Sequence, residues 1–183
     1  MIRSYRSEAL IIRKVKRGEA DSVITVLTRR QGLRVVFAKG IRRLKSKRAP
    51  FLDLFNHVVL YLSKGKTYDI VTDVEPIDNF GILKTHLSRV AGAFKISELT
   101  NRLLPESQSH EVIFDKVLNL FLILNQVEDQ DEEKIINGFG NFLLQELGFI
   151  PQSLTLTGKD IDRTLEEVME KKIKTNLLLA KLV

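Results

Sequence analysis

The chain has 183 residues, a formal net charge of +6, 44% hydrophobic and 28% charged residues, and no cysteine. These values indicate one large or two small domains of an ordinary globular protein, and they exclude disulfides and thiolate metal sites. No apolar run approaches the roughly 20 residues that span a bilayer. The first six residues do not resemble a signal peptide, so we expect a cytoplasmic protein with no membrane partner.

Positive charge is concentrated near the N-terminus. Residues 1–76 hold 17 Lys and Arg against 7 Asp and Glu, whereas residues 77–183 hold 12 against 16. Six cations fall within ten positions that contain no acid: Lys39, Arg42, Arg43, Lys45, Lys47 and Arg48. Folding does not require such a run, because clustered like charges repel and weaken the compact state. A polyanion relieves that repulsion and releases counterions, which indicates a nucleic-acid partner.

The N-terminal part is predicted to form five strands. Apolar or β-branched runs indicate strands at residues 9–15, 22–28 and 33–38, joined by short polar loops. A fourth strand is expected at 52–62, after Pro50, and a fifth at 67–74, after a glycine-containing turn. Five short strands are too few for an immunoglobulin-like sandwich and fit a small barrel, either an OB-fold or an SH3-like barrel.

The apolar spacing becomes helical after Pro76. We expect helices at residues 81–105, 111–127 and 132–147, a fourth that begins at Asp160 or Asp162 and ends near Lys172, and a short terminal helix at 177–183. The breadth of the apolar surface at 111–127 predicts a central helix. The fold class is therefore α+β, with a five-stranded barrel domain at residues 1–78 followed by an all-α domain at 79–183.

Enzymatic chemistry finds little support in the sequence. His57, His86 and His110 are far apart, and none has the spacing of a metal ligand. The sequence contains no Walker A motif, no G-x-G-x-x-G and no G-x-S-x-G. We expect a protein that is not an enzyme and carries no cofactor.

The basic segment falls between the third and fourth predicted strands, at the edge of the barrel. Long, flexible cations there suit phosphates, and a serine adds a hydroxyl donor. The primary candidates for DNA contact are Lys39, Arg42, Arg43, Lys45, Ser46, Lys47 and Arg48. Four further cations extend this surface into a stripe, namely Arg13, Arg29, Arg30 and Arg34. Lys64 and Lys66, in a turn, are expected only to increase solubility.

Aromatic residues that could stack on bases are few. Phe37 and Phe55 lie in apolar runs and are expected in the core, whereas Tyr5, Tyr61 and Tyr68 are candidates for exposure. Binding should therefore be dominated by charge, strongly dependent on salt and indifferent to base sequence.

Two alternatives remain open on charge alone. One is an RNA-binding OB-fold module, which would use the same cations. The other is an adaptor whose basic barrel docks an acidic peptide. The apolar helical faces are explained either by core packing or by a groove for a partner's helix.

The order of short segments resembles the RecO family of bacterial recombination-repair proteins. The segments that carry the resemblance are 8–13, 18–22, 28–33, 38–43, 45–47 and 52–55, with 142–144, 147–149 and Pro151 in the helical part. No single segment is specific, but their order and spacing are.

The resemblance implies an OB-fold that binds single- and double-stranded DNA, followed by a helical domain. It also implies strand annealing without catalysis, and assistance in loading the recombinase onto DNA coated with single-strand-binding protein. The implied partners are RecR and the acidic C-terminal tail of the single-strand-binding protein, in a cytoplasmic, nucleoid-associated setting. Many relatives carry a four-cysteine zinc site after the Gly-Phe-x-Pro stretch; residues 154–158 lack cysteine, so no zinc is expected.

Overall fold

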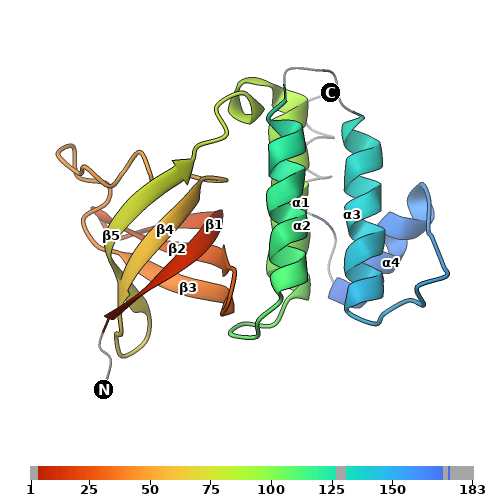
Figure 1. Cartoon of the computed structure of the whole chain (residues 1–183), viewed down its shortest axis with the longest axis horizontal. Helices are drawn as coiled ribbons and strands as arrows, with labels where there is room; N and C mark the ends of the chain where they lie inside the picture. Colours follow the sequence, from red (N-terminus) through yellow and green to blue (C-terminus); the bar gives the residue numbers. More distant parts are fainter. Residues whose placement is uncertain (1–3, 127–130, 171–172, 174–183) are drawn as a thin grey trace. The chain divides into compact units, whose positions relative to one another are not determined.

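A computed structural model describes residues 4–126, 131–170 and 173 (Figure 1). The chain forms two compact units, of which the first comprises residues 1–80 with 104–119 and the second comprises 81–103 with 120–183. The first unit contains the barrel, and the second contains most of the helices. The predicted terminal helix at 177–183 lies outside the described residues.

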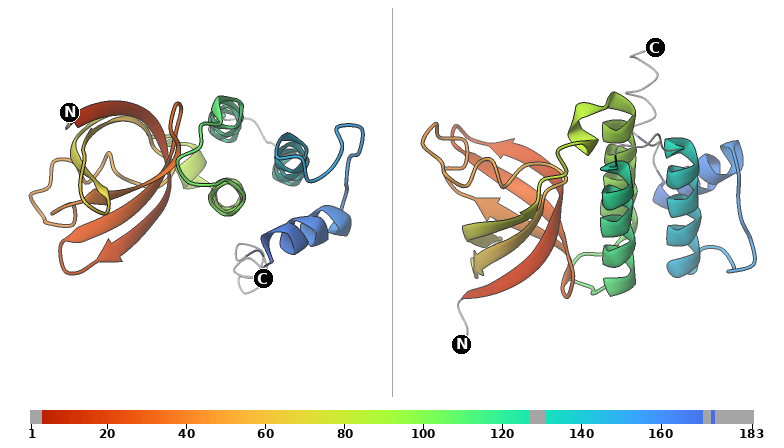
Figure 2. Two further views of the ribbon diagram at one scale, coloured as in Figure 1. Left: turned by 90° about the horizontal axis from the view of Figure 1, so that it is seen from below. Right: turned by 45° about the horizontal axis from the view of Figure 1, so that its top comes forward.

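The barrel consists of β1 (Ser4–Arg17), β2 (Asp21–Thr28), β3 (Gly32–Ala38), β4 (His57–Ser63) and β5 (Asp69–Asp78). The strands close in the order β1-β2-β3-β5-β4, and the left view of Figure 2 shows them curving into a ring. All pairs are antiparallel except β3 and β5, which pair in parallel at Val36–Asp69 and Phe37–Ile70. This closed five-stranded arrangement is that of the OB-fold, so the fold-class prediction is confirmed.

Alternation along the strands places one apolar set inside the barrel. The core consists of Ala9, Ile11, Ile24, Val26, Val36, Ala38, Ile41, Leu52, Val58, Leu60, Leu62, Val71 and Val74. In β1 the register shifts between Ile11 and Arg13, and from that point the strand directs Arg13 and Val15 to solvent. The residues of β1 are therefore mostly buried from Ser7 to Ile12 and mostly exposed from Arg13 onward.

The predicted strand at 52–62 is wrong in its first half. Residues 39–56 form a connector of successive turns, and β4 begins only at His57. Phe55 has a φ of 70° and donates its N–H to the Ile11 carbonyl at 2.7 Å, while the Asn56 amide bonds the Pro50 and Phe51 carbonyls. The apolar pattern predicted a strand because Leu52 and Phe55 are core residues, as expected for Phe55, but they reach the core from a turn.

A segment distant in the sequence completes the first unit. Leu33 on β3 forms a parallel bridge with Glu106, and its carbonyl accepts the Ser107 N–H at 2.9 Å. Helix α2 (Glu111–Leu124) follows, and its first half belongs to this unit. Leu10, Leu27 and Leu33 are buried as well, although they do not belong to the barrel core.

The second unit is helical. A short 3-10 turn at Leu83–Thr85 precedes α1 (Leu87–Leu103), so the helix starts later than predicted. Helix α3 (Glu132–Glu146) lies beside α1 and beside α4 (Lys159–Met169). Gly140 brings α3 close to Ile161 and Leu165 of α4. No helix among the described residues is long and apolar enough to span a membrane.

Replacing Gly32 by alanine should destabilise the first unit. Gly32 has a φ of 65°, and a Cβ there would lie 1.7 Å from the Gln108 carbonyl oxygen. We expect a loss of about 3 kcal/mol or more, measured by urea unfolding, because strain adds to the clash. Gly18→Ala is the control: its φ is 57°, but a Cβ would meet nothing within 4 Å, so about 1 kcal/mol is expected. Equal losses in the two variants would contradict the role of the close approach.

Candidate nucleic-acid interface

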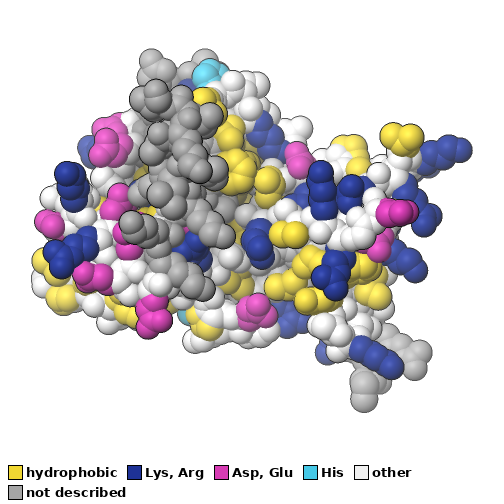
Figure 3. All heavy atoms as spheres, turned by 180° about the vertical axis from the view of Figure 1, so that it is seen from behind, with side chains coloured by type: hydrophobic (Ala, Val, Ile, Leu, Met, Phe, Trp, Pro, Cys, Tyr) yellow, Lys and Arg dark blue, Asp and Glu magenta, His cyan; other side chains and the backbone are white. Residues whose placement is uncertain are grey.

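The connector presents most of the predicted cations to solvent. Lys39, Arg42, Arg43, Lys45 and Lys47 are exposed, whereas Ser46 and Arg48 are half-buried. No described residue forms a side-chain hydrogen bond or ion pair with Arg43, Lys45 or Lys47. Their charges therefore remain available to a ligand. In Figure 3, Lys and Arg side chains gather over the barrel, with hydrophobic side chains between them.

Two members of the cluster are used to build the connector. The Arg48 guanidinium donates to the carbonyls of Val71 at 2.6 Å, Thr72 at 3.2 Å and Lys39 at 3.0 Å. The Arg42 guanidinium donates to the Gly18 carbonyl at 2.9 Å. Arg48 thus fixes the connector against β5, and Arg42 fixes it against the β1–β2 turn.

Backbone contacts complete this attachment. The Gly40 N–H donates to the Asp21 carboxylate at 2.7 Å, and the Arg42 N–H donates to the Ala20 carbonyl at 2.8 Å. Ile41, between them, is 1% exposed and packs in the barrel core. The backbone that carries the cations is consequently held in place before any ligand binds, which lowers the entropic cost of binding.

The four supporting cations divide into two pairs. Arg13 on β1 and Arg30 in the β2–β3 turn are exposed. Arg29 and Arg34 are only partly exposed and are engaged in ion pairs within the first unit. The structure therefore does not bring all four into one free stripe with the connector.

Arg29 links the barrel to α2. Its guanidinium donates to both oxygens of Glu8, at 2.8 and 3.2 Å, and to Asp115 at 2.6 Å, and it lies 4.6 Å from the centre of the Phe114 ring. His57 approaches Glu8 at 2.9 Å. The hydrogen bonds from Arg29, followed by that from His57, hold the pKa of Glu8 below its ordinary value despite partial burial.

Arg34 belongs to a second structural cluster. It donates to Asp69 at 2.7 Å and to the Ser107 hydroxyl at 2.9 Å, and the Tyr5 hydroxyl donates to the same carboxylate. Burial, together with Asp69, raises the pKa of Tyr5 to about 12. Tyr5 is therefore committed to Asp69 as a hydrogen-bond donor.

An apolar row on the outer face of the barrel was not recognised from the sequence. Val15, Val23, Phe37 and Ile70 occupy successive paired positions on β1, β2, β3 and β5. Paired residues point to the same side, and Ser22, Ile24, Val36 and Ala38 beside them are buried, so the row faces outward. The expectation that Phe37 is a core residue was wrong, since it is only half-buried.

This row lies at the same end of the strands as the connector. Val23 lies three residues after Ala20, the last residue of the β1–β2 turn, and Phe37 lies two residues before Lys39. Exposed Arg13, Lys16 and Arg17 flank Val15 along β1. The outer face therefore combines apolar side chains, on which bases can stack, with cations that can bind phosphates.

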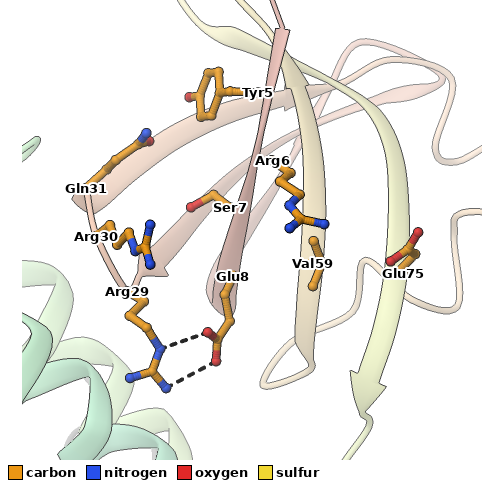
Figure 4. Close-up of a pocket in the computed structure, with 9 residues that line it drawn as sticks. All are labelled: Tyr5, Arg6, Ser7, Glu8, Arg29, Arg30, Gln31, Val59 and Glu75. Atoms are coloured by element: carbon orange, nitrogen blue, oxygen red, sulfur yellow. Dashed lines mark hydrogen bonds and ion pairs between the residues drawn. The ribbon is translucent and has the colours of Figure 1, made fainter.

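A polar cleft of about 540 Å³ lies elsewhere on the barrel, and its lining includes Arg6, Arg29, Arg30, Glu8 and Glu75 (Figure 4). Figure 4 shows Arg29 directed at Glu8. Glu75 accepts a hydrogen bond from the Tyr61 hydroxyl at 2.8 Å. Because acids accompany the cations here, the cleft is a weaker polyanion site than the connector.

Within the described ranges, no group of three His, Asp or Glu side chains is arranged to hold a metal ion.

Comparison with known proteins identifies the family. The model for the N-terminal part of recombination protein O matches residues 1–80, and the model for its C-terminal part matches residues 84–154. The chain belongs to the RecO family. The first match contains the connector and the apolar row, and the second contains α1, α2 and α3.

Curated relatives carry the description DNA repair protein RecO. The chain is similar to those of a Roseiflexus species (38% identity, covering 82% of this chain and 52% of the relative), of Dehalococcoides mccartyi (34%, 81% and 58%) and of Symbiobacterium thermophilum (32%, 84% and 60%). The chain thus spans 52 to 60% of the length of these RecO relatives.

The Glu8–Arg29 pair should make stability depend on acid pH. The pKa of Glu8 is lowered in the folded state, so ionised Glu8 stabilises the fold above its ordinary pKa of about 4.3, and this contribution is lost as the pH falls through the folded value. Glu8→Gln should therefore reduce stability near neutral pH and flatten the decline below about pH 5. The midpoints of urea unfolding of the wild-type protein and of Glu8→Gln, measured at several pH values, test this prediction.

Glu19→Gln is the control for this measurement, since Glu19 is exposed in the β1–β2 turn. If Glu8→Gln and the wild-type protein lose stability in parallel on acidification, the ion pair does not act as described.

Proposed function

We propose that the chain is a non-enzymatic DNA-binding protein of recombinational repair that works without a bound metal or cofactor. It binds single- and double-stranded DNA, anneals complementary strands, and assists recombinase loading together with RecR and the tail of the single-strand-binding protein. The observation that carries the DNA-binding part is the exposed cation group on a fixed connector, next to an outward apolar row on an OB-fold barrel, in a RecO-family chain.

The geometry supports a division of roles. Arg43, Lys45 and Lys47 neutralise phosphates, because their side chains have no partner among the described residues. Phe37 and its neighbours in the apolar row support the faces of unpaired bases. Neutralised phosphates reduce the repulsion between two strands, so a second, complementary strand can approach and pair.

Replacing Arg43, Lys45 and Lys47 together by alanine should weaken binding to single-stranded DNA. The slope of log affinity against log salt should decrease by about 2, because each lost phosphate contact contributes about 0.7. Affinity near 0.1 M salt should fall about tenfold or more, with a matching loss of annealing rate. Fluorescence anisotropy over a salt series and an oligonucleotide annealing assay measure these effects. Arg42 and Arg48 are left unchanged because they hold the connector in place.

The matched control replaces Lys134, Lys159 and Arg163 by alanine, which removes the same charge from exposed helical positions. The control should bind and anneal almost as the wild type does. Equal losses in both variants would indicate an effect of net charge alone. Competition by RNA as strong as by DNA would favour the RNA-binding alternative, and tight binding to an acidic peptide with none to DNA would favour the adaptor.

Phe37→Ala should weaken binding to single-stranded DNA by about 1–3 kcal/mol, because one base loses its stacking surface. The salt slope should stay unchanged, since no charge is removed. Phe37→Tyr keeps the ring and should restore affinity, which separates stacking from a general disturbance of β3. An Ala variant that is folded by circular dichroism and binds as tightly as the wild type would remove Phe37 from the interface.

A further inference from the structure

Leu44 is the most exposed large apolar residue among those described. Its relative accessible surface is 106%, and the exposed Arg42, Arg43, Lys45 and Lys47 surround it in sequence. Full exposure of a leucine is unfavourable in water, because its surface gains nothing from burial. The position therefore combines a fully exposed apolar side chain with positive charge, and a partner that accepts both would bury the leucine and neutralise the cations.

The connector places other apolar side chains in the barrel core. Ile41, three residues earlier, is 1% exposed in the barrel core, and Leu52 is fully buried there. The connector thus directs some apolar side chains inward, while Leu44 points outward between them.

The backbone around Leu44 is fixed on both sides. Before it, the Arg42 N–H donates to the Ala20 carbonyl at 2.8 Å, and the Arg43 N–H donates to the Gly40 carbonyl at 3.2 Å. After it, the Ser46 N–H donates to the Arg43 carbonyl at 2.9 Å, and the Arg48 guanidinium bonds three carbonyls. These bonds turn the chain at Leu44 and hold its side chain away from the barrel.

DNA offers both chemistries at once. Phosphates flank every base step, and a base step opened by unstacking presents two apolar faces. Proteins insert leucine and similar side chains between base pairs in this way, with nearby cations on the phosphates. An acidic peptide would satisfy the cations, but it would bury the leucine only if it carried apolar side chains at the matching position.

We infer that Leu44 is a wedge that inserts between stacked bases when the connector cations bind the DNA backbone. The inference rests on the proposed DNA binding and adds a role to it. Insertion unstacks bases in a single strand or at a duplex end, which exposes their pairing edges to a second strand.

The test uses oligonucleotides that carry the fluorescent base analogue aminopurine, whose emission rises when it is unstacked. The wild-type protein, at saturating concentration, should raise the emission of single-stranded and duplex probes. Leu44→Ala should remove most of that rise while changing affinity by no more than about threefold, since charge supplies most of the affinity. Leu44→Phe should keep the rise. Leu154→Ala, which alters another exposed leucine, should behave as the wild type.

The outcomes separate the two proposals. If the wild-type protein binds no DNA by anisotropy, the proposed function fails, and the wedge fails with it. If it binds but aminopurine emission does not rise, or rises equally with Leu44→Ala, the wedge is overturned while DNA binding stands. Because Leu44 is fully exposed, a folded Ala variant is expected, and circular dichroism verifies it.

Discussion

One guanidinium group joins three strands of the barrel to the helix that covers it. Arg29 follows β2 directly, bonds Glu8 on β1 and Asp115 on α2, and lies over the Phe114 ring; Glu8 also meets His57 on β4. The planar fork of arginine suits this role, because it can bond two carboxylates and contact a ring at the same time, which a lysine ammonium cannot. The end of β2 that carries Arg29 is therefore committed to structure. The surface that we propose for ligand binding lies at the opposite end, at the β1–β2 turn and the connector.

Basic residues perform two different roles in the first unit. Arg29, Arg34 and Arg48 are half-buried and hold elements together, whereas Arg43, Lys45 and Lys47 stay in solvent with their charges unpaired among the described residues. Compensation of the first group by Glu8, Asp69 and main-chain carbonyls keeps the fold stable. The lack of compensation in the second group produces the local positive potential that attracts a polyanion.

Much of the fold could be predicted from the sequence. β-Branched runs located the strands, helical spacing located the helices, and the basic run was placed correctly between β3 and β4. The turn at 52–56 was mistaken for strand, since an apolar pattern reports burial and not backbone direction. The roles of Arg29 and Arg34 depend on Asp115 and Ser107, far along the chain, and no local signal reveals them. Residues 35–38 are all apolar, so no alternation of polar and apolar residues could assign Phe37 to the outer surface.

The pairing of Leu33 with Glu106 also concerns the solubility of the barrel. β3 pairs with β5 only near its C-terminal end, so the first part of β3 would be an open strand edge if residues 104–110 were absent. Open edges recruit strands from other molecules. We expect an OB-fold cut from the chain at residue 80 to keep the surface proposed for DNA binding but to be prone to self-association. Residues 104–110 thus protect the edge of β3 from pairing with other molecules.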